Sequence, residues 1–126
     1  MRLRPASRAT NTANVIVGSA GSFNEFQLLD GAFLSSIGGN LGSTGGRSNR
    51  VVISDGSTWT NSRSLVIGDA GPGNSLLASN GARVFSLGGT IGNGSSSSNN
   101  LAVFTGGTTV WSNASSLVIG GSGTDN

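Results

Sequence analysis

The octapeptide NSLLASNG at residues 74–81 decides the fold, because similar stretches recur along the chain at intervals of 25 residues. NRVVISDG lies at 49–56, NEFQLLDG at 24–31 and the more divergent NNLAVFTG at 99–106. Each stretch begins with an asparagine (Asn24, Asn49, Asn74 and Asn99) and ends with a glycine seven residues later (Gly31, Gly56, Gly81 and Gly106). A fixed period of this length predicts structural units that stack on one another.

The residues within each period favour strands and turns over helices. Apolar runs last three to five residues and are separated by Gly, Ser, Asn and Thr, which are typical of turns. A 25-residue unit with three such runs predicts one rung of a right-handed parallel β-helix, and the all-β chain should make about four and a half turns. Three columns of stacked side chains should fill the core: Phe26, Val51, Leu76 and Leu101; Leu28, Ile53, Ala78 and Val103; Leu41, Ile67, Ile91 and Ile119.

The repeated polar residues have structural explanations at the corners of such a coil. Stacked asparagine amides can donate a hydrogen bond to one neighbouring rung and accept one from the other, which predicts a ladder of Asn24, Asn49, Asn74 and Asn99. The four glycines should supply positive φ at the next corner. Between these corners, Glu25 and Arg50 should lie next to each other on adjacent rungs.

The domain boundaries follow from a second, longer period. The motif LVIG occurs at 65–68 and at 117–120, preceded by Trp59 and Trp111 respectively, so the units pair into blocks of about 50 residues. We expect solenoid repeats over 14–126, divided into 14–63, 64–115 and a partial unit at 116–126. Residues 1–13 carry three of the seven arginines and should form a disordered basic tail. Both ends of the solenoid are cut within a repeat, which indicates a fragment of a longer protein whose open ends invite end-to-end self-association.

Composition excludes several classes of chemistry. The chain has no Cys, His, Lys or Tyr, so it lacks the side chains of Ser–His–Asp and Cys–His nucleophilic sites and of thiolate or imidazole metal sites. From residue 14 onward the chain has four arginines and five acidic residues. It lacks the basic face with interleaved aromatic residues that nucleic-acid binding would require. We therefore expect no enzyme activity, no cofactor, no metal and no nucleic-acid partner. No apolar run approaches the length of a membrane span.

Two alternatives to a purely structural chain remain open. Asp30 and Asp55 occupy one column, and paired carboxylates could cleave a polysaccharide, although each stands directly before a turn glycine, where Asp is expected for local reasons. Trp59 and Trp111, the two tryptophans, are candidate ligand contacts if they face outward, because an aromatic face can stack on a sugar ring. Packing in the core is the favoured interpretation of both tryptophans.

Several short motifs resemble a known class of repeat. SLVIGDAG at 64–71, SNGARV at 79–84, GGTIG at 88–92 and SLVIGGSG at 116–123 resemble the autotransporter and PEP-CTERM-associated repeat of bacterial surface proteins. This resemblance implies a right-handed β-helix stalk, export and an extracellular or cell-surface location, and it supplies no catalytic residues. The expected function is a non-catalytic structural stalk or passenger segment. The first alternative is an adhesin or a solenoid surface that binds a cell-surface or extracellular polysaccharide or protein, and the less favoured one is a polysaccharide lyase or hydrolase.

Overall fold

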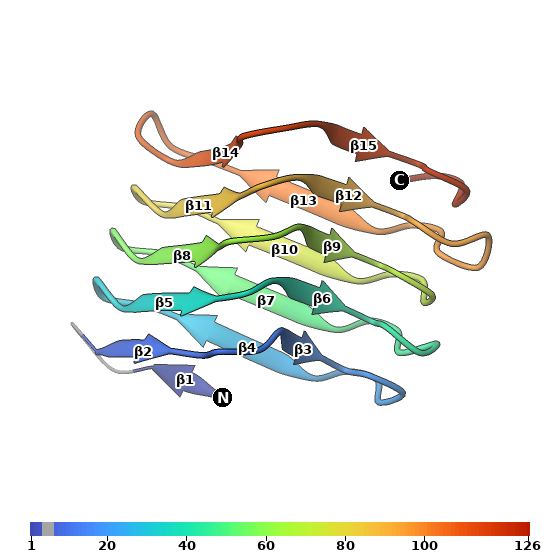
Figure 1. Ribbon diagram of the computed structural model, residues 1–126, viewed down its shortest axis with the longest axis horizontal. Coiled ribbons are helices and arrows are strands. Elements are labelled where there is room, and N and C mark those ends of the chain that lie inside the picture. The colour runs from blue at the N-terminus through green and yellow to red at the C-terminus, as the bar shows by residue number, and fades with distance from the viewer. Residues whose placement is uncertain (4–6) are drawn as a thin grey trace.

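The computed structural model describes residues 1–3 and 7–126, with residues 2 and 3 described as backbone alone. Across these residues the chain forms fifteen short β-strands and no helix, arranged as five rungs of three strands (Figure 1). The strands are β1 (Arg2–Leu3), β2 (Arg8–Thr10), β3 (Val15–Val17), β4 (Glu25–Leu28), β5 (Phe33–Ser36), β6 (Gly39–Leu41), β7 (Arg50–Ile53), β8 (Thr58–Asn61), β9 (Leu65–Ile67), β10 (Ser75–Ala78), β11 (Arg83–Ser86), β12 (Gly89–Ile91), β13 (Leu101–Phe104), β14 (Val110–Asn113) and β15 (Leu117–Ile119).

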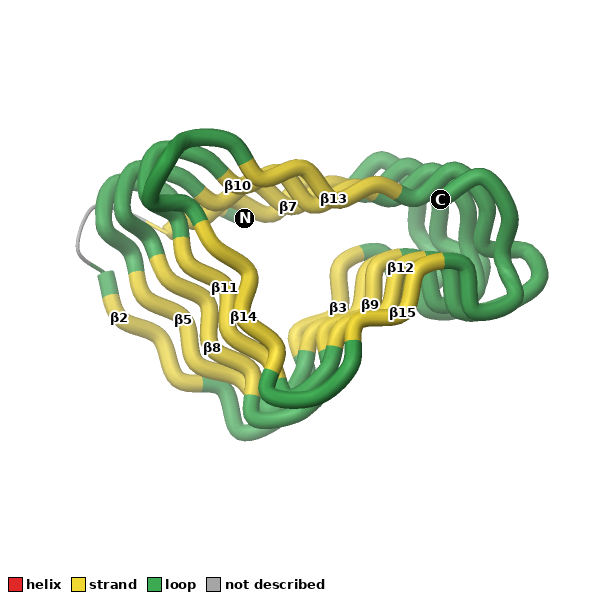
Figure 2. The backbone as a smooth tube through the Cα atoms, turned by 90° about the horizontal axis from the view of Figure 1, so that it is seen from above, coloured by secondary structure: helices red, strands yellow, loops and turns green. Residues whose placement is uncertain are grey.

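Every pairing between the strands is parallel, and each strand pairs with its counterparts in the adjoining rungs. Three five-stranded sheets result, in the orders β1-β4-β7-β10-β13, β14-β11-β8-β5-β2 and β15-β12-β9-β6-β3, which we call sheets A, B and C. Seen along the axis, the rungs superimpose around a single elongated core (Figure 2). Figures 1 and 2 together show that the chain rises as a right-handed coil, which confirms the predicted parallel β-solenoid.

Alternation along each strand explains why the short apolar runs suffice for a core. In β7 the side chains of Val51 and Ile53 are buried, while those of Arg50 and Val52 face outward. The columns predicted from the period hold through the fourth rung, with Phe26, Val51 and Leu76 in register and Leu41, Ile67 and Ile91 in another sheet. Each rung covers the apolar side chains of its neighbours, which no single rung can bury alone.

In the fifth rung the prediction for sheet A is wrong by one residue. Leu76 pairs with Ala102, and Ala78 pairs with Phe104, so the inward side chains there are Ala102 and Phe104 and not Leu101 and Val103. Leu101 is exposed and extends the outward column of Glu25 and Arg50. The cause is one extra residue in the loop before β13.

The first corner after sheet A has the predicted turn chemistry. Asp30, Asp55 and Asn80 have φ of 59°, 56° and 52°, and the glycine after each is also left-handed. Left-handed backbone at two successive positions favours Asp or Asn followed by Gly, because these residues tolerate it at least cost. At the fourth corner Gly106 has φ 95° while Thr105 is not left-handed, and the turn there is longer.

The N-terminal segment corrects the expected domain boundary. Residues 1–13 were predicted to be a disordered tail, but β1 and β2 within this segment pair in parallel with β4 and β5. Arg8 lies with its guanidinium 4.4 Å from the centre of the Phe33 ring. Residues 4–6 of the predicted tail lie outside the described residues. The solenoid therefore includes a first rung that its weak repeat signal conceals.

The 50-residue double period has a packing explanation. The ring of Trp59 on the third rung lies over Gly39 of the second rung, where an added Cβ would come within 2.7 Å of it. Trp111 on the fifth rung lies over Gly89 of the fourth in the same way, at 2.6 Å. A large ring on one rung therefore requires a glycine on the rung before it, and the two kinds of rung alternate.

Candidate functional site

A column of stacked asparagines runs the length of the solenoid at the corner that precedes sheet A. The Nδ2 of Asn24 donates to the Oδ1 of Asn49 at 3.0 Å, and that of Asn49 donates to Asn74 at 3.0 Å. In each step the backbone N–H of the same residue donates to the same oxygen. Because one oxygen accepts two hydrogen bonds from the preceding rung, the amides satisfy the backbone as well as one another.

The fourth member of this column is Asn100, not Asn99 as the sequence period suggested. Asn74 donates to the Oδ1 of Asn100, and Asn100 in turn donates to the Oδ1 of Asn126 at 3.1 Å. Asn99 is exposed and left-handed, with φ 55°. The extra residue that shifts β13 also shifts the ladder, and two adjacent asparagines leave the sequence ambiguous at this point. Turn and ladder geometry accounts for these amides without a ligand.

Both tryptophans face inward. Trp59 is completely buried, and its Nε1 donates to the Ser36 hydroxyl at 2.9 Å. Trp111 is half-buried, donates to Ser86 at 2.9 Å and stacks on Phe104 with ring centroids 5.8 Å apart. The possibility that these residues are outward platforms for a sugar is therefore wrong, and the core interpretation holds for both.

The two stacked carboxylates, Asp30 and Asp55, lie at exposed turns. Asp55 accepts hydrogen bonds from Ser54 at 2.6 Å and from Asn80 at 3.1 Å. These two hydrogen bonds, that from Ser54 foremost, lower the pKa of Asp55 below its usual value of 3.8. A general acid in a glycosidase needs the opposite shift, so this pairing stabilises the turn and is poorly suited to acid catalysis.

The described residues contain no group of three or more acidic or other ligating side chains that could hold a metal ion. In these residues no helix has the length and apolar character needed to cross a membrane.

The outer face of sheet B carries an exposed aromatic residue that the 25-residue period does not predict. Phe85 on β11 is 38% exposed and borders a shallow hollow of about 270 Å³ together with Leu87 and Ser112. Arg83 is exposed on the same strand and the same face, two residues away. The signal was present in the alternation of β11, where buried Val84 and Ser86 leave Arg83 and Phe85 on the outside.

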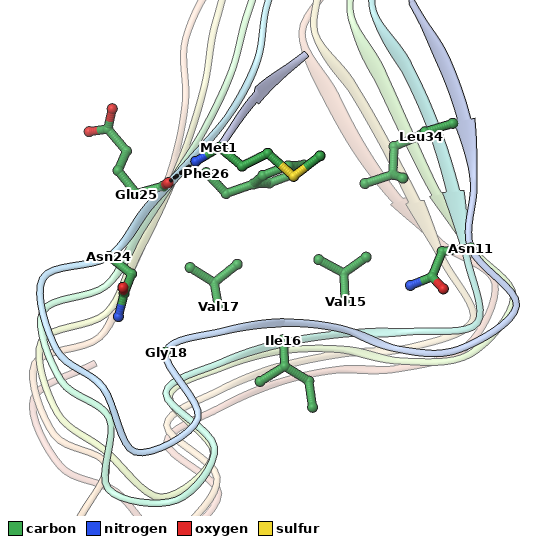
Figure 3. A pocket seen from close by; sticks show the side chains of 11 residues that line it. Met1, Asn11, Val15, Ile16, Val17, Gly18, Asn24, Glu25, Phe26 and Leu34 are labelled. Atoms are coloured by element: carbon green, nitrogen blue, oxygen red, sulfur yellow. Dashed lines mark hydrogen bonds between the residues drawn. The ribbon is translucent and has the colours of Figure 1, made fainter.

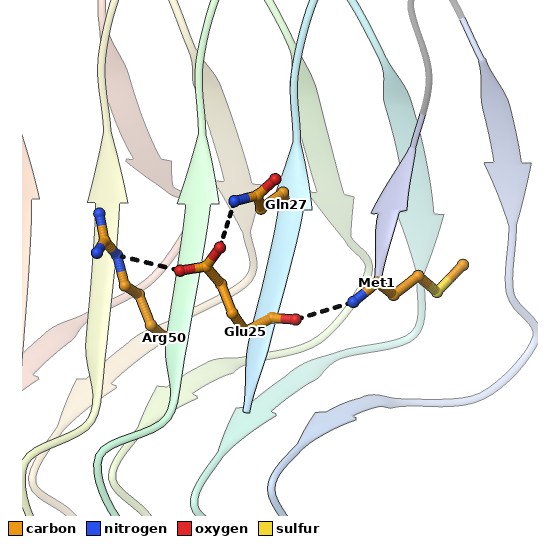
Figure 4. Close-up of polar contacts among 4 residues, drawn as sticks. All are labelled: Met1, Glu25, Gln27 and Arg50. Carbon is orange, nitrogen blue, oxygen red and sulfur yellow. Dashed lines mark hydrogen bonds and ion pairs between the residues drawn. The ribbon is translucent and has the colours of Figure 1, made fainter. Parts of the chain in front are cut away.

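The outer face of sheet A is polar near its N-terminal end. Glu25 lies 3.8 Å from Arg50, accepts a hydrogen bond from Gln27 through its carboxylate, and accepts one from the N-terminal ammonium of Met1 through its backbone oxygen (Figure 4). The Glu25 and Arg50 side chains are about half exposed, so this pair contributes roughly 0–1 kcal/mol.

A hollow of about 440 Å³ lies at the N-terminal end, and every residue that lines it belongs to the first two rungs. Figure 3 shows the side chains of Val15, Val17, Phe26 and Leu34 facing into it, while Ile16 points away. At the opposite end Leu117 and Ile119 are 47% and 58% exposed, although their counterparts Leu65 and Ile67 are completely buried. Apolar side chains whose counterparts are buried in the middle rungs are thus accessible at both ends of the described solenoid.

Comparisons with protein-family models, with curated proteins and with solved structures gave no match to this chain.

Proposed function

We propose that this chain is a non-catalytic structural stalk or passenger segment of a secreted or surface-displayed bacterial repeat protein. The observation that carries the proposal is the asparagine ladder, which links the rungs from Asn24 to Asn126 through buried or partly buried amide hydrogen bonds. Successive rungs lie about 4.8 Å apart along the axis, and the contacts of each rung are with rungs close to it. A column of this kind gains length in proportion to its number of rungs, which suits a spacer.

The chemistry of the carboxylates supports the proposal that the chain is not a catalyst. Asp55 has a lowered pKa and an exposed position, so it remains ionised at neutral pH and donates no proton there. The absence of His, Lys, Cys and Tyr from the sequence leaves few other groups that titrate near neutrality. Release of reducing ends from bacterial or plant polysaccharides by the purified chain would overturn this part of the proposal.

The surface location can be tested with single cysteines, because the native chain has none. Ser112 is exposed on the outer face of sheet B, so Ser112→Cys should react with a membrane-impermeant maleimide on intact cells that produce the protein. Ala82→Cys is the matched control, because Ala82 is completely buried and should react after unfolding in urea. Labelling of Ser112→Cys that requires cell lysis would contradict surface display.

The exposed aromatic face of sheet B favours a second candidate function, the binding of a glycan. Phe85 offers a stacking face, and Arg83 and Ser112 offer hydrogen-bond donors beside the hollow. Phe85→Ala should weaken binding to a glycan array about two- to tenfold, since such an aromatic contact contributes about 0.5–1.5 kcal/mol. Leu101→Ala, an exposed apolar residue on sheet A, is the control and should leave binding unchanged. Equal binding by both variants, or none by the native chain, would exclude this site.

A further inference from the structure

We propose that Asn80 is a site of spontaneous deamidation in the folded chain, and that the hydroxyl of Thr109 controls the rate. Asparagine is a thermolabile residue, and it is most labile before glycine, because no side chain shields the backbone nitrogen that attacks it. The chain has two such pairs, Asn80-Gly81 and Asn93-Gly94, and both asparagines are exposed. This modification does not depend on the stalk or the glycan-binding function, since it concerns the chemistry of one turn.

The reaction joins the backbone nitrogen of Gly81 to the Cγ of Asn80. The nitrogen loses its proton to water and attacks Cγ, the bond from Cγ to Nδ2 breaks, and ammonia leaves with a proton taken from water. The product is a cyclic imide, a succinimide, which water then opens at either of its two carbonyl carbons. Opening at Cγ gives aspartate, and opening at the backbone carbonyl carbon gives isoaspartate. The net change is the loss of ammonia and the gain of water.

Two hydrogen bonds oppose the first step at Asn80. Its Nδ2 donates to the Oδ1 of Asp55 on the preceding rung at 3.1 Å. The N–H of Gly81 donates to the Oγ1 of Thr109 on the following rung at 3.0 Å. The attack requires the side chain of Asn80 to turn toward the nitrogen and requires that nitrogen to give up its proton, so both hydrogen bonds slow the reaction.

The acceptor for the N–H of Gly81 is an exception at this corner. In the two preceding rungs the equivalent glycines donate to backbone oxygens of the next rung. Gly31 donates to Asp55 at 2.8 Å, and Gly56 donates to Asn80 at 2.9 Å. The next turn is longer, and no backbone oxygen among the residues that the structure describes accepts from Gly81. A rotatable side-chain hydroxyl therefore replaces a fixed carbonyl oxygen at the Asn-Gly pair of this corner.

The second Asn-Gly pair has the same kind of side-chain contact but a backbone acceptor. The Nδ2 of Asn93 donates to the Oδ1 of Asp69 at 2.7 Å, and the N–H of Gly94 donates to the backbone oxygen of the same aspartate at 2.9 Å. The backbone oxygen of Gly94 in turn accepts from the N–H of Ser97 at 2.9 Å. Because the two pairs share sequence and exposure and differ in this acceptor, Asn80 should react before Asn93.

The two products change the corner in different ways. Aspartate at position 80 matches its counterparts Asp30 and Asp55, but it places a second carboxylate where Asp55 now accepts a hydrogen bond. Isoaspartate passes the backbone through the former side chain and lengthens it by a methylene group, which displaces the oxygen that accepts from Gly56. Deamidation therefore adds negative charge to the corner between sheets A and B and loosens the contact between two rungs.

The experiment follows both sites in the purified 126-residue chain during incubation at neutral pH and physiological temperature. Trypsin cleaves after Arg63 and Arg83, so Asn80 and Asn93 lie in separate peptides, and mass spectrometry measures the deamidated fraction of each over time. The chain unfolded in urea gives the rates without structure. Both sites should react more slowly in the folded chain than in the unfolded one, and folded Asn80 should react at least about twice as fast as Asn93.

Two substitutions at position 109 isolate the hydroxyl. Thr109→Val keeps the shape of this partly exposed side chain and removes the acceptor, so the rate at Asn80 should rise about two- to tenfold, the range that one hydrogen bond contributes. Thr109→Ser keeps the hydroxyl and should react like the native chain. Asn93 is the internal control, because a general loosening of the fold would raise the rate there too. Equal rates at the two asparagines of the native chain would overturn the proposal, as would a Thr109→Val variant in which the rate at Asn80 is unchanged or rises no more than at Asn93.

Discussion

Replacement of Asn74 by alanine tests whether the ladder holds the rungs together. The Asn74 side chain is completely buried, and its Oδ1 accepts from the backbone N–H of Asn49 at 3.0 Å. Its Nδ2 donates to the backbone oxygens of Gly46 at 3.2 Å and Gly71 at 2.9 Å. Asn74→Ala therefore leaves one donor and two acceptors of the backbone without a partner in the interior.

The expected cost follows from these three groups. A buried polar group that loses its partner costs about 1–3 kcal/mol, and a water entering the space left by the amide offsets part of the sum. We expect a loss of about 3 kcal/mol, a large share of the roughly 5–15 kcal/mol that stabilises a domain. For a chain of this size the melting temperature should fall by about 10 °C. Urea unfolding followed by the fluorescence of the buried Trp59 measures the change.

The control is Asn24→Ala, in the same column but at the exposed N-terminal end. Asn24 donates to Asn49 and to the backbone oxygen of Ser22. After the substitution the Oδ1 of Asn49 still accepts from the backbone N–H of residue 24, and Ser22 is partly exposed to solvent. Its loss should cost less than about 1 kcal/mol. If Asn74→Ala and Asn24→Ala destabilise the chain equally, or if Asn74→Ala costs under about 1 kcal/mol, the reasoning that assigns the amide column this role fails.

Three further predictions concern packing, register and charge. Gly39→Ala places a methyl group 2.7 Å from the Trp59 ring and should lower the free energy of unfolding by about 1–3 kcal/mol, measured by the same urea titration, with no loss as the refuting result. Asn100→Ala should lower the melting temperature several degrees more than Asn99→Ala, and the reverse order in calorimetry would place the ladder on Asn99. Because the pKa of Asp55 is lowered, its ionised form stabilises the fold above pH 3.8, and this contribution is lost as the pH falls through the pKa of the folded state. Asp55→Asn should therefore make the stability depend less on pH in the acid range. Acid titrations followed by circular dichroism measure this dependence, and an unchanged acid range would contradict the assignment.

The sequence predicts the coil because one period of the sequence corresponds to one rung of the stack. A residue that repeats at this interval and faces the axis stacks on its equivalents in the adjacent rungs. Asn24, Asn49 and Asn74 can therefore be aligned from the sequence alone. Asn99 failed because an insertion of one residue beside a pair of asparagines gives two equally good alignments, and only the hydrogen bonds of Asn100 distinguish them.

The parts that escaped prediction depend on contacts between different columns. Trp59 and Gly39 are not equivalent positions of the repeat, so no alignment of copies with one another could show that one fills the space left by the other. The outward position of Phe85 follows from the alternation of buried and exposed residues in β11 and not from the 25-residue period. The first rung was missed because Ala9 replaces the tryptophan that identifies its counterparts.

The alternation of ring and glycine also constrains how a gene for such a chain can grow or shrink. Loss of one rung by unequal crossing-over would set the Trp111 ring against a rung with Leu65 in place of Gly89, while loss of two rungs would return the ring to Gly39. Replication slippage that yields a foldable product therefore proceeds in steps of about 50 residues. The smallest segment of the coding sequence that can be duplicated or lost is therefore twice as long as the structural repeat.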